Sequence, residues 1–79
     1  MSTKLEELSI IKDEMLMNPN VNARMVLAAS KLAEDDRYLY ELLLDYMKVV
    51  DEDIKKMLFD DAMNYTEETI RTMKLRNEL

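Results

Sequence analysis

The stretch that decides the fold is residues 36–50, which read DRYLYELLLDYMKVV. At about 100° per residue, its apolar side chains cover most of the circumference of a helix. The remaining polar strip consists of Glu41, Asp45 and Lys48. Because this apolar arc is wider than a surface helix needs, we expect other helices of the chain, or a second molecule, to cover it.

The composition favours helices and argues against strands. The 79 residues contain no glycine and one proline, whereas all-β folds rely on glycine at positive φ in their tight turns. Leu, Met, Glu, Lys and Ala, which favour helices, are abundant. A chain of this length forms one small domain. We therefore predict a single all-α domain over residues 1–79, built as a bundle of four to five short, mostly antiparallel helices.

Two signals define the first half of the chain. Thr3 followed by Glu6 is a capping-box pattern, which predicts a helix over about residues 4–17. The residue before a proline avoids helical geometry, so the Asn-Pro pair at residues 18–19 predicts a break. Because Asn-Pro also suits an N-cap followed by the first helical position, a second helix is predicted over about residues 19–34.

Carboxylates mark the helix starts in the second half. Those in residues 34–36 suit the N-terminus of the central helix over residues 36–50. No glycine or proline forces a break there, so one bent helix is the alternative to the short turn that we predict. The carboxylates in residues 51–53 favour a fourth helix from about Ile54. Thr66 predicts the N-cap of a fifth helix.

The residue types present argue against an enzyme. The chain has no histidine and no cysteine, so the commonest general base and the thiol nucleophile are missing. Without glycine it cannot form a phosphate-binding P-loop or a dinucleotide-binding fingerprint. We predict no catalytic residues, no cofactor and no small-molecule substrate. The carboxylates of Asp51, Glu52, Asp53 and Asp60 offer oxygen ligands for a hard metal ion, but helix capping explains the first three, and we predict no metal site.

Two further classes of partner are disfavoured. Binding to nucleic acid is driven by Lys and Arg that neutralise phosphates, and the chain has no basic stripe. No apolar run approaches the ~20 residues that a membrane helix requires, and the N-terminus lacks the apolar segment of a signal peptide. We therefore predict a cytoplasmic protein that binds neither nucleic acid nor membrane directly.

The acidity is concentrated in the middle of the chain. Of the net charge of −6, residues 34–68 contribute twelve acidic residues against four basic ones. Carboxylates at helical spacing can imitate a row of phosphates and occupy the basic cleft of a nucleic-acid-binding enzyme. The alternative is that the carboxylates form a solvated surface. The residues of this predicted acidic face are Asp36, Glu41, Asp45, Asp51, Asp53, Asp60, Asp61, Glu67 and Glu68.

The eight methionines suggest an interface, because Met is common at adaptable binding surfaces as well as in cores. Several apolar residues fall outside the predicted core stripes of their helices, and together they would make an exposed docking patch. The alternative is that the first and last helices cover them. This predicted docking set is Tyr40, Leu44, Met47, Phe59 and Met63.

The function that these observations favour is binding to protein. We predict a small acidic regulator, adaptor or inhibitor that docks on a larger protein or associates with itself as a homo-oligomer. The alternative is a nucleic-acid mimic that blocks a basic cleft. Small, acidic, glycine-free helical chains of this kind resemble virus-encoded host-interaction proteins, although no motif carries that resemblance.

Overall fold

The computed structural model describes residues 3–77 and contains four helices and no strand in that range. Their bounds are α1 Lys4–Leu16, α2 Ala23–Leu32, α3 Arg37–Lys48 and α4 Glu52–Asn77. The all-α prediction is confirmed. The predicted fifth helix is not a separate element, because α4 is continuous over 26 residues.

Short-range hydrogen bonds start the helices as the sequence predicts. The Thr3 hydroxyl accepts from the Glu6 amide at 3.1 Å, and the Glu6 carboxylate accepts from the Thr3 amide at 3.4 Å, which completes the capping box of α1. Asp36 caps α3 by accepting from the Leu39 amide at 3.1 Å. A short turn, and not one bent helix, therefore separates α2 from α3.

The predicted start of the second helix is wrong by four residues. Pro19 lies in the turn between α1 and α2, and the helix begins at Ala23. The Asn22 side chain is the N-cap and accepts from the amides of Arg24 and Met25 at 3.0 and 3.4 Å. Because Asn22 satisfies two free amides, it offers the better helix start than the Asn-Pro pair.

The predicted N-cap at Thr66 is also wrong. Thr66 lies inside α4, is fully buried, and donates its hydroxyl proton to the Ala62 carbonyl oxygen at 2.7 Å. A threonine hydroxyl can bond either forward as a cap or backward to the fourth preceding carbonyl. The buried position against the core selects the second arrangement, and the helix continues.

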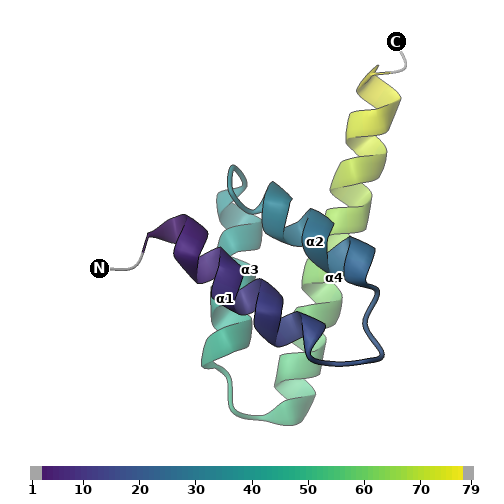
Figure 1. Cartoon of the computed structure of the whole chain (residues 1–79). Coiled ribbons are helices and arrows are strands. Elements are labelled where there is room, and N and C mark those ends of the chain that lie inside the picture. The colour runs from purple at the N-terminus through teal and green to yellow at the C-terminus, as the bar shows by residue number, and fades with distance from the viewer. Residues whose placement is uncertain (1–2, 78–79) are drawn as a thin grey trace.

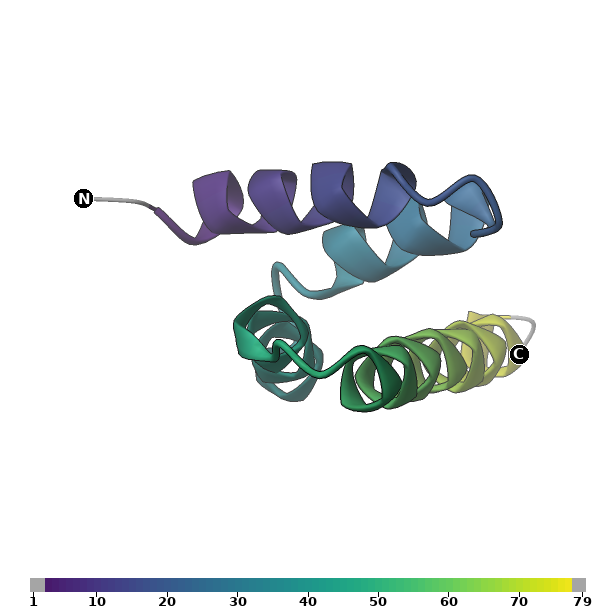
Figure 2. The same ribbon diagram turned by 90° about the horizontal axis from the view of Figure 1, so that it is seen from below.

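The four helices form two crossing layers (Figures 1 and 2). The chain reverses direction between α1 and α2 and again between α3 and α4. Figure 2 shows the α1–α2 layer above the α3–α4 layer, and the helices of one layer cross those of the other. The mostly antiparallel bundle that the sequence predicts is therefore not confirmed for the molecule as a whole.

The core lies where the layers cross. Every helix contributes to it, and the central helix supplies Leu39 and Leu43, both fully buried. The complete buried apolar set is Leu8, Ile11, Met15, Val26, Ala29, Ala33, Leu39, Leu43 and Ala62. Alanine at three of these positions allows close approach of the helices, since interaxial distance depends on side-chain size.

Several residues that the sequence places in the core are exposed. Val50 is 89% exposed, and Met57 and Ile54, which the periodicity of the fourth helix assigns to its buried stripe, are 64% and 49% exposed. Crossed helices cover each other only near the crossing point, so an apolar stripe is not covered along its whole length. The C-terminal part of α4 illustrates this, because it projects beyond the other three helices (Figure 1).

Candidate functional site

The predicted docking set, Tyr40, Leu44, Met47, Phe59 and Met63, does not stand free on the surface. All five side chains are half-buried and pack against the core. Phe59 and Met63 also line a groove beside α4, whereas the other three do not contribute to it. The structure therefore brings two of the five together at a candidate site.

This groove is open and has a volume of about 1200 Å³. It lies between the α1–α2 turn, the beginning of α2 and one side of α4, and we call it the α2–α4 groove. Ligand pockets for small molecules usually have volumes of roughly 300–1000 Å³ and enclose most of the ligand. An open groove of this size suits a segment of protein better. Its apolar lining consists of Met17, Val21, Met25, Tyr46, Phe59 and Met63.

Asparagines shape the wall of the groove opposite α4. Asn18 accepts a hydrogen bond from the Asn20 amide at 2.9 Å and thereby tightens the turn after α1. Asn22 then caps α2. These local bonds set the path of the backbone at Val21 and Met25, which line the groove.

The other wall is α4, and its start is fixed by Asp51. The Asp51 carboxylate accepts from the amides of Asp53 and Ile54 at 2.9 and 3.1 Å, so the helix begins directly after it. Residues four apart on a helix lie on the same face. Phe59 and Met63 consequently present one apolar strip to the groove.

The rim of the α2–α4 groove is acidic. Carboxylates outnumber ammonium groups, so the groove attracts a positively charged occupant. The charged residues that line it are Glu14, Glu52, Asp53, Asp60 and Glu67 against Lys55 and Lys56.

Tyr46 links the apolar lining to this rim. Its ring centroid lies 6.0 Å from that of Phe59, and the Lys55 ammonium lies 4.7 Å from the Tyr46 centroid. Burial, together with the negative charges of Glu14 and Glu52, raises the pKa of the Tyr46 hydroxyl above its ordinary value of 10.0. The hydroxyl is therefore protonated at neutral pH and can donate a hydrogen bond.

The predicted acidic face is divided among several roles. Asp36 and Asp51 cap helices, and Glu41 pairs with the Arg37 guanidinium at 3.2 Å. Asp53, Asp60 and Glu67 line the groove. The other exposed carboxylates of the set are those of Asp45, Asp61 and Glu68.

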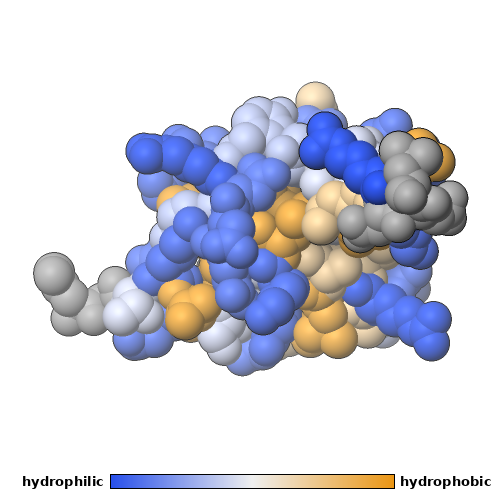
Figure 3. All heavy atoms as spheres, turned by 90° about the horizontal axis from the view of Figure 1, so that it is seen from above, coloured by the Kyte–Doolittle hydropathy of each residue, from blue (hydrophilic) through white to orange (hydrophobic). Residues whose placement is uncertain are grey.

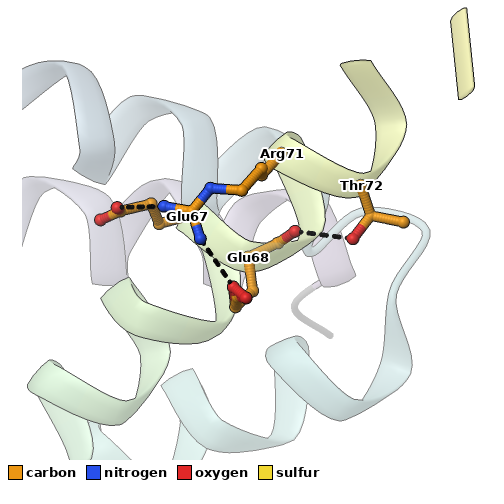
Figure 4. A network of polar contacts seen from close by, with 4 residues as sticks. All are labelled: Glu67, Glu68, Arg71 and Thr72. Carbon is orange, nitrogen blue, oxygen red and sulfur yellow. Dashed lines mark hydrogen bonds and ion pairs between the residues drawn. The ribbon is translucent and has the colours of Figure 1, made fainter. Parts of the chain in front are cut away.

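Arg71 neutralises part of this acidity near the end of α4. Its guanidinium bonds Glu67 and Glu68, each at 3.0 Å, and Thr72 donates to the Glu68 carbonyl oxygen at 3.0 Å (Figure 4). All four residues are exposed, so these contacts contribute little to folding stability. The bond to Arg71 does orient the Glu67 carboxylate, which lines one end of the groove.

The structure also bears on metal and membrane sites. Within residues 3–77, no three Asp, Glu, His or Cys side chains come together as a group that could hold a metal ion. In that same range, no helix has both the length and the apolar character of a membrane span.

Sequence reasoning missed Met17, Val21 and Met25 as groove residues. Val21 and Met25 have the spacing of core residues in the predicted second helix, and Met17 falls outside the apolar stripe of the first helix. The available signal was Met17 at a helix end, followed by three asparagines that alternate with other residues, since Met is favoured at adaptable binding surfaces. No protein-family model, curated protein or solved structure matches the chain.

Proposed function

We propose that this protein is a small acidic regulator, adaptor or inhibitor that binds an amphipathic helix of a protein partner in the α2–α4 groove. The observation that carries this proposal is the combination of a methionine-rich apolar lining with an acidic rim in one open groove. Amphipathic helices lay their apolar face in such grooves and direct their polar face outward.

The size of the groove supports a helical occupant. Two turns of helix with their side chains, about 10 Å across and about 11 Å long, fill roughly 850 Å³. The groove of about 1200 Å³ accommodates that volume. An occupant with Lys or Arg beside its apolar stripe would pair with the rim carboxylates, so a basic helix should bind better than an acidic one.

A titration with two synthetic helices tests the proposal. One peptide carries leucines at helical spacing among lysines, and the matched peptide replaces every lysine by glutamate. We expect only the basic peptide to bind, with NMR shift changes centred on Phe59 and Met63. Shift changes of equal size with both peptides, or changes confined to another face, would contradict the proposal.

Two methionines of α4 provide matched variants. Met63→Gln removes an apolar side chain from the groove, whereas Met57→Gln changes an exposed residue outside it. We expect Met63→Gln to weaken binding of the basic peptide about tenfold and Met57→Gln to have no effect. A single buried apolar anchor contributes on the order of this factor in an interface.

The nucleic-acid mimic is the second candidate function. Asp53, Asp60 and Glu67 favour it, because their seven-residue spacing places them in one row along α4. A contact made by that row alone would weaken steeply with salt and would not respond to Met63→Gln. If the Met63→Gln variant still binds its partner as well as the wild type does, and if that binding weakens steeply with salt, the result would therefore favour the mimic over helix docking.

A further inference from the structure

Among the described residues, no other part of the chain covers the C-terminal part of α4. The side chains of residues 71–76 are all exposed, and Figure 1 shows this part of the helix projecting past the rest of the molecule. Met73 is 48% exposed and Leu75 is 61% exposed. Seen from above, Figure 3 shows apolar residues exposed between hydrophilic side chains near the middle of this face of the molecule.

The charge of this projecting segment is opposite to that of the groove. Residues 69–77 contain Arg71, Lys74 and Arg76 and no acidic residue. The α2–α4 groove, by contrast, has five carboxylates and two lysines. The seven residues from Arg71 to Asn77 form about two turns of helix, and the volume of the groove is large enough for a segment of that size.

The acidic residues that α4 contributes to the groove and the basic residues of its projecting end lie along the same side of the helix. Seven residues are close to two helical turns, so Asp60, Glu67 and Lys74 form one row. Met63 and Ile70, also seven apart, form the neighbouring row. One side of α4 therefore carries acidic and apolar residues at its first half and basic and apolar residues at its second half.

We propose that the occupant of the α2–α4 groove is the projecting end of α4 from a second copy of the chain, in a dimer with antiparallel α4 helices. This inference rests on the proposed function of the groove. A twofold axis near Glu67 places Lys74 of each copy beside Asp60 of the other and Ile70 beside Met63. A twofold interface requires a surface that is complementary to itself. This side of α4 provides such a surface through the Asp60–Lys74 and Ile70–Met63 pairings. Arg71 of the same chain already pairs with the Glu67 carboxylate that lies near the axis.

A charge exchange tests the pairing. Sedimentation of the whole chain is followed from about 10 µM to about 1 mM, the range of weak complexes. We expect a monomer–dimer equilibrium that weakens with salt. Lys74→Glu and Asp60→Lys should each raise the dissociation constant at least tenfold, because each places like charges together. The double variant should recover most of the wild-type affinity.

Lys48→Glu is the control, because Lys48 is an exposed base at the end of α3 and does not line the groove. It should leave the dimer unchanged. A wild-type chain that stays monomeric up to about 1 mM, or a double variant no tighter than the single variants, would overturn the inference. Binding of the basic peptide to a monomeric chain would overturn the dimer alone and leave the proposed function standing.

Discussion

The hydroxyl of Tyr65 on α4 donates a hydrogen bond to the carboxylate of Asp36, the N-cap of α3, at 2.5 Å. The same carboxylate accepts from the Leu39 amide at its other oxygen. One side chain thereby begins α3 and ties that helix to its neighbour, 29 residues further along the chain. The Tyr65 ring also lies 4.8 Å from that of Tyr38.

This bond predicts a loss of stability at alkaline pH. Its acceptor Asp36, followed by burial, is the main cause that raises the pKa of Tyr65 above 10.0. A raised folded-state pKa means that the contribution is complete below pH 10.0 and is lost as pH rises through the folded pKa. Tyr65→Phe should cost about 1 kcal/mol at neutral pH. Urea unfolding should show a smaller cost at about pH 11, which lies above the ordinary pKa of tyrosine.

Tyr40→Phe is the matched control for that experiment. Within residues 3–77 the Tyr40 hydroxyl makes no side-chain hydrogen bond, although its ring lies 4.8 Å from the Lys4 ammonium. Loss of the Tyr40 hydroxyl should change the free energy of unfolding by less than about 0.5 kcal/mol. An equal cost for both variants would show that the Tyr65–Asp36 bond contributes nothing specific.

Ser30 predicts a stabilising substitution. It lies inside α2, and its buried hydroxyl oxygen finds no hydrogen-bond partner among the described residues. Ser30→Ala removes that buried polar group and introduces the best helix former, so stability should rise by about 1 kcal/mol. The melting temperature measured by circular dichroism checks this, and a decrease would contradict it.

Replacing either of two adjacent leucines of α3 should reduce folding stability, but by unequal amounts. Leu43 is fully buried, whereas Leu44 is half-buried at the edge of the core. Leu43→Ala should cost about 3 kcal/mol through lost burial and the cavity left behind, and Leu44→Ala about half as much. Urea denaturation measures both values, and equal costs would show that the two positions are covered alike.

Because α4 is continuous through Thr66, a proline introduced at position 67 should reduce folding stability. If a helix began after Thr66, Glu67 would be its first residue, where proline is favoured. In the continuous helix Glu67 is internal, and Glu67→Pro should cost about 3 kcal/mol or more. Glu67→Ala is the control and should cost less than about 0.5 kcal/mol, since it removes an exposed ion pair with Arg71.

The local signals in the sequence predicted most helix starts. Thr3, Asp36 and Asp51 all cap helices by accepting from amides two or three residues later. Such bonds depend only on neighbouring residues, so the sequence contains the necessary information. The two errors, at residues 18–19 and at Thr66, arose where a second local arrangement was equally open to the chain.

The candidate site was predictable only in part. Phe59 and Met63 were recognised because they fall off the expected core stripe of their helix. Val21 and Met25 were not, since both carry the spacing of core residues yet lie at a groove. Periodicity identifies which side chains share a face of a helix, but not whether another helix covers that face.

By itself, the sequence determined that this protein is all helical, where most of its helices begin, and that its acidity lies in the middle of the chain. The tertiary structure alone decided that the layers cross, that Thr66 is buried within α4, and that Val50 and Met57 are exposed. The physical reason is the distance along the sequence over which each kind of interaction acts. Caps and propensities act within a few residues, whereas burial depends on contacts between helices that are distant in sequence.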